Sequence, residues 1–421
     1  METDCTTPPP AGETKATPLP AGTRLLHIGP HKTGTTAIQG ALFAARERLP
    51  EYGVEFPAHT RHPMEAALAA CARPAMMGDT EPTDRHWSRL LERVRATGAR
   101  TSVISSEFFA DAPDDATIAR VVEQLGGDRV HVLVTLRPLA RIMPSQWQQY
   151  VQNGLRMGYE DWLEHMLRKP PYEKPNPSFW RRHRHDRLVE RWAGAVGAER
   201  VTVVVVDDRD RGGLLRTFET LLGLPANLLR PVPDTANRSL TLAETELLRN
   251  LNIEFRGNGL PDALYSRLVR GGAVPHMKNA CSPTSRDVKI PTPRWAVEEA
   301  CAIGAEMAGR IGALGVRVLG DPSLLSAVPE QPEQPEQPEQ PDRPDQPEQT
   351  DQPDRPERPA EGGSGEARIA PEVAARALYG ALAAAASMTG GAAPARSVHQ
   401  TPSKELVRVL GHRCLRRLGR R

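Results

Sequence analysis

The sequence has few cysteines, few aromatic residues and no long, strongly apolar run. Its five cysteines are scattered, and no two stand in CxxC spacing. The sequence therefore predicts neither a zinc knuckle nor a disulfide framework, and it shows no cluster of metal ligands. No apolar run is long enough to cross a bilayer, and the first 22 residues lack the apolar core of a secretion signal. We expect a cytoplasmic protein.

Neither positive nor negative charge is in large excess. The chain has 54 Lys and Arg residues against 52 Asp and Glu residues, a formal net charge of +2. A balance of this kind gives no whole-protein field that would attract nucleic acid, so we expect no nucleic-acid partner. The hydrophobic share of 39% in 421 residues is enough to bury a sizeable core.

Composition divides the chain into four parts. Residues 1–22 are rich in Pro, Thr and Gly and are expected to be a flexible leader, and residues 23–320 carry the pattern of a folded α/β domain. Residues 329–360 place a proline at nearly every third position among Glu, Gln and Asp, which predicts a disordered, extended spacer. Residues 361–421 are first Ala-rich, with helical potential, and then basic.

The basic end of the chain has two interpretations. Apolar side chains recur there every fourth residue among arginines, at Leu406, Leu410, Cys414 and Leu418. Such a pattern is typical of an amphipathic helix that makes weak contact with an anionic membrane surface or a protein. The small apolar share favours a solvated tail instead, and we assign no site to it.

The folded part alternates apolar runs with helical patterns. Short Val-rich runs predict strands over residues 25–28, 101–105, 130–136 and 201–206. Period-3.6 patterns predict helices over residues 35–49, 84–97, 118–125, 139–153, 186–196, 214–222, 240–255 and 295–311. The alternation predicts an α/β fold of the P-loop nucleotide-hydrolase class, with a doubly wound parallel sheet flanked by helices.

The stretch GPHKTGTT, residues 29–36, follows the first predicted strand and opens the first predicted helix. Backbone N–H groups at a helix N-terminus converge on an anion, and the helix dipole favours negative charge there. In this stretch Lys32 supplies a positive charge, Gly34 allows close approach, and three hydroxyls belong to Thr33, Thr35 and Thr36. Gly and Thr are also ordinary turn and cap residues, but strand, loop, lysine and helix together favour an anion site.

The order of residues in this loop differs from that of a nucleoside triphosphatase. Gly29 and Gly34 have the spacing of GxxxxGK[ST], yet Thr35 stands where the lysine belongs. This order disfavours a P-loop nucleotide kinase or phosphotransferase, which stays as an alternative. A non-catalytic nucleotide-binding protein that docks through its spacer and tail is a second alternative.

At these residues the sequence resembles sulfotransferases that use 3′-phosphoadenosine-5′-phosphosulfate (PAPS). Residues 30–36 match the Pro-x-Lys-Ser/Thr-Gly-Thr-Thr pattern of the family's 5′-phosphosulfate loop. The strand 132–136 is followed by Arg137 and, eight residues later, Ser145, as in the family's 3′-phosphate motif. The resemblance covers residues 24–155 and implies transfer of a sulfuryl group from PAPS without a metal.

The resemblance also implies catalytic roles. Lys32 would stabilise the departing phosphate oxygen, and Glu107, just after the strand 101–105, resembles the glutamate base of the carbohydrate (heparan-type) branch. A helix cap is the structural alternative for Glu107. The phenol and steroid branch uses a histidine instead, for which His31 is the weaker candidate, whereas His27 lies on the strand. The expectation for both histidines is that they pack or orient the donor. The acceptor would be a small-molecule or glycan hydroxyl or amine, on a carbohydrate, lipid or natural product.

Outside these motifs the resemblance is loose. The late GxxGxWK element of the cytosolic branch is absent, and three basic residues could clamp phosphate in its place or form a surface loop: Lys278, Arg286 and Lys289. Three residues of the helix after Arg137 either border the acceptor or adenine pocket or pack in the core: Trp147, Gln148 and Asn153.

Overall fold

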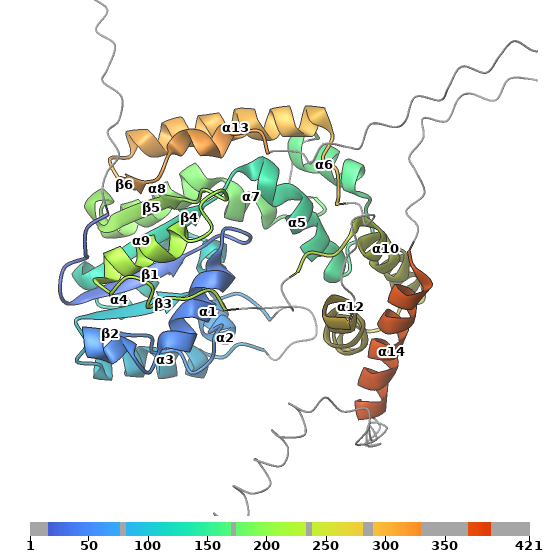
Figure 1. The fold of residues 1–421 in the computed structure, drawn as a ribbon, viewed down its shortest axis with the longest axis horizontal. Coiled ribbons are helices and arrows are strands. Elements are labelled where there is room, and N and C mark those ends of the chain that lie inside the picture. The colour runs from blue at the N-terminus through green and yellow to red at the C-terminus, as the bar shows by residue number, and fades with distance from the viewer. Residues whose placement is uncertain are drawn as a thin grey trace, which may run out of the picture.

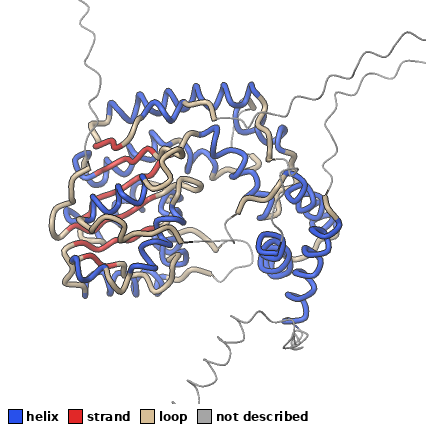
Figure 2. Tube along the Cα trace, viewed as in Figure 1, coloured by secondary structure: helices blue, strands red, loops and turns tan. Residues whose placement is uncertain are grey.

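A parallel sheet of six strands forms the centre of the molecule (Figures 1 and 2). The computed structural model describes residues 16–75, 81–169, 174–232, 238–280, 289–329 and 369–388. The strand order is β2-β3-β1-β4-β5-β6, and every neighbouring pair is parallel. The predicted α/β class with a doubly wound parallel sheet is therefore confirmed.

The four predicted strands form the middle of the sheet. The strands are β1 (Thr23–Ile28), β2 (Val54–Glu55), β3 (Thr101–Ser105), β4 (Val130–Leu136), β5 (Val201–Val205) and β6 (Arg317–Leu319). The edge strands β2 and β6 were not predicted, because two or three residues are too few for an alternation to appear. The chain reverses its direction of winding between β1 and β4, and the carboxyl ends of strands at such a point are where α/β sheets bind ligands.

Two layers of helices cover the sheet, and alternate strand residues face them. Leu25 and Leu133 point into the layer made by α1 (Thr35–Ala45) and α9 (Gly213–Leu222). Their neighbours in the strands face the opposite layer, made by α2 (Met64–Ala70), α3 (Asp84–Ala96), α4 (Asp115–Gln124) and α8 (His185–Val196). Both faces of the strands are thus buried, as their continuous apolar sequence predicted.

A helical unit with its own core adjoins the carboxyl end of the sheet. It contains α5 (Leu139–Gln152), α6 (Tyr159–Leu167), α7 (Phe179–His183), α10 (Leu242–Gly257), α11 (Asp262–Tyr265), the π-helix η6 (Ser266–Ala273) and α12 (Val274–Ala280). Helix α13 (Arg294–Ala313) joins the two parts, since Ala300 packs in this core and Ile311 in the core under the sheet. Trp147 and Trp162 are fully buried in the helical unit.

The Ala-rich segment forms helix α14 (Pro371–Met388), which packs against η6 and α12 (Figure 1). Gly272 and Gly380 meet at the crossing: a Cβ on Gly380 would lie 2.5 Å from the carbonyl oxygen of Gly272. His276 and Tyr379 add an edge-to-face ring contact at 5.5 Å. Helices approach this closely only where both carry small residues, so the two glycines fix the place at which α14 docks.

Three of the parts predicted from composition fall largely or wholly outside the described residues. These are most of the leader, the Pro-rich spacer and the basic tail beyond Met388. In the part of the chain that the structure describes, no helix combines the length and hydropathy needed to cross a membrane.

We predict that Gly380→Leu detaches α14 while the sheet domain stays folded. The new side chain would overlap the backbone of η6, and overpacking of this kind costs about 1–3 kcal/mol. Hydrogen exchange should then show amides of α14 exchanging about tenfold faster or more, with unchanged protection in the sheet. Leu382→Ala, at an exposed position of the same helix, is the control. Undiminished protection of α14 in Gly380→Leu would contradict the assignment.

Candidate active site

The loop between β1 and α1 has the backbone of an anion cradle. Lys32 has a φ of 73° and Gly34 a φ of 100°, both in the left-handed region. Only glycine adopts this region freely, so the conformation of Lys32 is strained and is held by its surroundings. No side chain caps helix α1, whose first N–H groups have no partner within the helix. Those groups are available to an anion.

Two of the three threonine hydroxyls are used inside the loop. Thr33 Oγ1 donates to the carbonyl of Pro30 at 2.7 Å, and Thr35 Oγ1 donates to the carbonyl of Gly29 at 3.0 Å. A Cβ on Gly29 would lie 1.8 Å from Thr35 Oγ1, so this position requires glycine. Since the N–H of Thr33 also bonds to Pro30, the N–H groups from Gly34 to Thr36 remain as the cradle.

A chain of hydrogen bonds ties the loop to the sheet beneath it. His27 Nδ1 is 2.8 Å from Ser105 Oγ and His27 Nε2 is 3.1 Å from Thr135 Oγ1, which in turn is 3.0 Å from Thr33 Oγ1. Thr33 gives its proton to Pro30, so Thr135 must donate to Thr33 and accept from His27. It follows that neutral His27 carries its proton on Nε2 and accepts from Ser105.

Burial keeps His27 neutral. The ring is fully buried on β1, and burial lowers its pKa to about 3. The expectation that His27 packs is therefore met with a polar role added, since it links β1 to β3 and β4. Sequence reasoning did not identify Ser105 or Thr135, because a hydroxyl in a strand has no distinguishing pattern.

Lys32 reaches from the loop to helix α5. Its Nζ donates to Gln149 Oε1 at 3.1 Å. Burial, followed by the charge of Lys278, lowers the pKa of Lys32 to about 8, while Glu107 acts in the opposite direction. An ammonium group with a depressed pKa is one that an incoming anion would stabilise strongly, because the site holds positive charge without enough counter-charge.

Glu107 begins the 3₁₀ turn η2 (Glu107–Asp111) directly after β3. Burial raises the pKa of its carboxyl group, against hydrogen bonds from its own backbone and from Gln39 and the charges of Arg182 and Lys32. Gln39 Nε2 donates to the carbonyl of Ser105 at 2.9 Å and to Glu107 Oε2 at 3.4 Å. The Oε1 of Gln39 therefore accepts from His62 Nδ1, at 2.5 Å, so the orientation of this amide is fixed.

His31 lies against Phe108, in apolar and positive surroundings. Its ring meets Phe108 edge-to-face at 5.3 Å, and its buried Nε2 has no partner among the described residues. Burial and the charges of Arg182, His183 and Lys32 hold the pKa of His31 well below its usual range. Arg182 is itself paired in two hydrogen bonds with the buried carboxylate of Asp111.

Arg137 stands at the end of β4, next to the loop. Its Nη1 donates to the carbonyl of Lys32 at 3.4 Å, and its Nη2 forms an ion pair with Asp208 Oδ1 at 2.9 Å. Burial lowers the pKa of Arg137, and Asp208 opposes the shift. Ser145, in α5, donates its hydroxyl to the carbonyl of Ile142. The structure thus brings Arg137 and Lys32 into contact and places Ser145 in the second turn of α5, the helix that follows Arg137.

Of the three basic residues that could clamp phosphate, Lys278, Arg286 and Lys289, one lies near Lys32 among the described residues. Lys278 in α12 is close enough to Lys32 to lower the pKa of the latter, whereas Lys289 is exposed and Arg286 lies outside the described residues. For Trp147, Gln148 and Asn153, the structure favours packing over a place at the acceptor or adenine pocket. Trp147 and Gln148 are buried and donate to the carbonyls of Met157 and Leu240, and Asn153 caps the end of α5.

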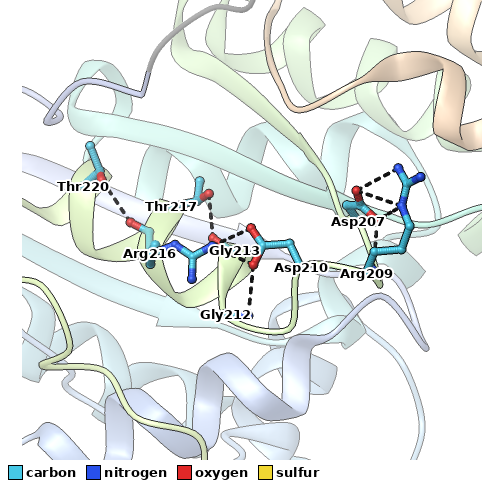
Figure 3. Close-up of polar contacts among 8 residues, drawn as sticks. All are labelled: Asp207, Arg209, Asp210, Gly212, Gly213, Arg216, Thr217 and Thr220. Atoms are coloured by element: carbon cyan, nitrogen blue, oxygen red, sulfur yellow. Dashed lines mark hydrogen bonds and ion pairs between the residues drawn. The ribbon is translucent and has the colours of Figure 1, made fainter.

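A cavity of about 290 Å³ lies beside α9. Its lining includes the apolar residues Val204 to Val206 and Leu319 together with charged and hydroxyl side chains, among them Asp207, Asp210, Arg216, Thr217 and Thr220 (Figure 3). Figure 3 shows two of these residues, Arg216 and Asp210, paired with each other, and a third, Asp207, paired with Arg209. Leu214 connects the cavity to the loop, since a Cβ on Gly34 would lie 2.8 Å from it.

We predict that the buried histidines make the fold acid-labile. Below pH 6.5 the unfolded chain binds protons that neutral His27 does not bind, so stability is complete above pH 6.5 and falls as the pH drops toward 3. The buried rings whose pKa is likewise lowered are His31, His131, His183 and His185. Each contributes at most about 1.4 kcal/mol per pH unit.

Denaturant unfolding between pH 7 and pH 4 measures this slope. His27→Asn should flatten it by up to one proton, while His59→Asn, at an exposed position, should leave it unchanged. Equal slopes for wild type and His27→Asn would contradict the prediction.

Across the described ranges, no group of three or more His, Cys, Asp and Glu side chains could hold a metal ion. No family model matches the chain, and no curated protein matches it. A solved sulfotransferase from Alicyclobacillus acidocaldarius is similar in structure at 16% identity and a TM-score of 0.42, covering 70% of this chain and 96% of that chain. A likeness this low says nothing about the chemistry of this chain, so the functional proposal rests on the residues of the site.

Proposed function

We propose that the chain is a sulfotransferase that uses PAPS as donor. The observation that carries the proposal is the contact between the two motifs: the guanidinium of Arg137 bonds to the carbonyl of Lys32 itself. A loop with three converging N–H groups and an arginine fork beside it suit a nucleotide with two separate anionic groups. The phosphosulfate would lie on the loop and the 3′-phosphate at Arg137 and Ser145.

The purine of this donor has an apolar face and a polar edge. The cavity beside α9 offers the same combination, and Leu214 joins it to the loop. We therefore place the base in this cavity.

The reaction is an in-line displacement at sulfur. An acceptor oxygen forms a bond to sulfur while the bond from sulfur to the bridging oxygen of the 5′-phosphate breaks. Negative charge grows on that bridging oxygen, and Lys32 is the cation beside the loop that stabilises it. The products are the sulfated acceptor and adenosine 3′,5′-bisphosphate, and the scheme needs no metal.

Glu107 takes the proton of the acceptor hydroxyl. Its raised pKa makes the carboxylate a stronger base than a solvated one, and Gln39 holds one of its oxygens. His31 is the weaker base, because its lowered pKa leaves it little affinity for a proton. The presence of Glu107 favours the carbohydrate-type branch, and the acceptor is a small-molecule or glycan hydroxyl or amine.

A nucleotide kinase of the same fold is the second candidate. In such enzymes the lysine of the loop signature contacts the β- and γ-phosphates. Here Thr35 stands at that position, and its hydroxyl donates to the carbonyl of Gly29. The replacement of lysine by threonine at this position supports the sulfotransferase over the kinase.

We expect adenosine 3′,5′-bisphosphate to stabilise the protein and ATP with magnesium not to do so. A ligand at 100 times its Kd stabilises the folded state by about 2.7 kcal/mol, which a thermal-shift titration detects readily. Arg46→Gln, at the exposed C-terminal cap of α1, is the control and should respond as wild type does. Stabilisation by ATP with magnesium alone would remove the sulfotransferase proposal.

We expect kcat/KM for sulfate transfer to have a bell-shaped dependence on pH. Glu107 must be ionised, so activity rises with pH through its raised pKa, and Lys32 must be protonated, so activity falls above about 8. Glu107→Gln should lower kcat by about 100-fold or more and remove the acidic limb. Lys32→Ala should lower kcat without altering the unfolding temperature. An acidic limb that persists in Glu107→Gln would reject Glu107 as the base.

A further inference from the structure

One carboxylate bridges two arginines at the edge of the donor site, and this arrangement has no place in the motifs described so far. Asp208 Oδ1 is 2.9 Å from Arg137 Nη2, and Asp208 Oδ2 is 3.1 Å from Arg141 Nε. Arg137 ends β4, Arg141 lies in the first turns of α5, and Asp208 follows β5. Two segments 67 residues apart in sequence therefore meet at one anionic group.

We propose that Arg141 is a second guanidinium of the 3′-phosphate subsite, and that Asp208 competes with the 3′-phosphate for both arginines. The inference rests on the proposed donor. It adds one residue that binds the donor and one that weakens its binding.

The spacing places Arg141 on the same side of α5 as Ser145. Arg141 and Ser145 are four residues apart in this helix, and side chains four apart lie on one face, whereas Arg137 precedes the helix, directly after β4. The shared carboxylate shows that the guanidinium of Arg141 turns toward Arg137. An anion held by Arg137 and Ser145 therefore lies within reach of Arg141.

The chemistry of the bridging group matches that of a phosphate. A carboxylate and a phosphate both present oxygens to the planar fork of a guanidinium. The side chain of Asp208 is 29% exposed, as is that of Arg137, so solvent and ligand reach the pair. A phosphate that takes these N–H groups must displace Asp208 from at least one of them.

The charges of these groups decide whether Asp208 strengthens or weakens binding of the 3′-phosphate. Two guanidiniums and one carboxylate carry a net charge of +1, whereas the 3′-phosphate brings close to two negative charges. The carboxylate therefore repels the phosphate and also occupies its donors. Without Asp208, the affinity for any nucleotide with a 3′-phosphate should rise, and the product would leave more slowly.

The effect of Arg141 and Asp208 on binding should depend on the 3′-phosphate of the nucleotide. Adenosine 3′,5′-bisphosphate and AMP share the base, the ribose and the 5′-phosphate, and they differ in the 3′-phosphate alone. A change at Arg141 or Asp208 should therefore alter the affinity for the first nucleotide and leave that for the second unchanged.

The experiment is calorimetric titration of both nucleotides into wild type, Arg141→Gln and Asp208→Asn, with the melting temperature of each free protein as a check on folding. Arg141→Gln should weaken binding of the bisphosphate about three- to tenfold, since half-exposed ion pairs contribute up to about 1 kcal/mol. Asp208→Asn should tighten it by a similar factor. Neither variant should change the affinity for AMP.

Arg46→Gln and Glu47→Gln remove the members of an exposed ion pair just after α1 and are the matched controls. Weaker bisphosphate binding in Asp208→Asn, or equal changes for both nucleotides, would overturn the inference and leave Asp208 as a support for Arg137. Unchanged binding in Arg141→Gln would overturn the role of Arg141. Wild type that does not prefer the bisphosphate to AMP would contradict the proposed donor itself, which is a separate outcome.

Discussion

The hydrogen-bond chain from Ser105 through His27 and Thr135 to Thr33 is the constraint on which the site depends. It runs in one direction and ends at the Pro30 carbonyl, so each hydroxyl and each ring nitrogen has one role. The chain crosses three strands directly below the loop. A loop that holds Lys32 at a left-handed φ needs such support, because the strain would otherwise relax in the absence of other contacts.

The site lies where the two cores of the molecule adjoin. The loop and Glu107 follow strands of the sheet, whereas Gln149 and Lys278 belong to the helical unit. The bond from Lys32 to Gln149 and the electrostatic effect of Lys278 join the two parts at this point. Any displacement of the helical unit relative to the sheet would therefore change the environment of Lys32 first.

The sequence predicted the helices and strands that show a continuous or periodic apolar pattern and the residues that belong to a motif. The four central strands and the position of Lys32, Arg137 and Ser145 at one edge follow from continuous apolar runs and fixed spacing. Gln39, Asp208 and Thr135 could not be predicted, because each acts through a partner about 65 to 100 residues away in sequence. The close crossing of Gly272 and Gly380 has the same cause. Tertiary contacts of single residues leave no local pattern.

The positive charges of the site are only partly neutralised by its carboxylates. Lys32 has a lowered pKa and Glu107 a raised one, so burial disfavours both charges more than their mutual attraction restores them. Asp111 neutralises Arg182, and Asp208 shares its charge between Arg137 and Arg141. Among these groups, positive charge thus remains at the loop and, as one net unit, at Arg137 and Arg141, where an anion would gain most from it. The position of the carboxylates, more than the number of cations, decides where an anionic donor is held.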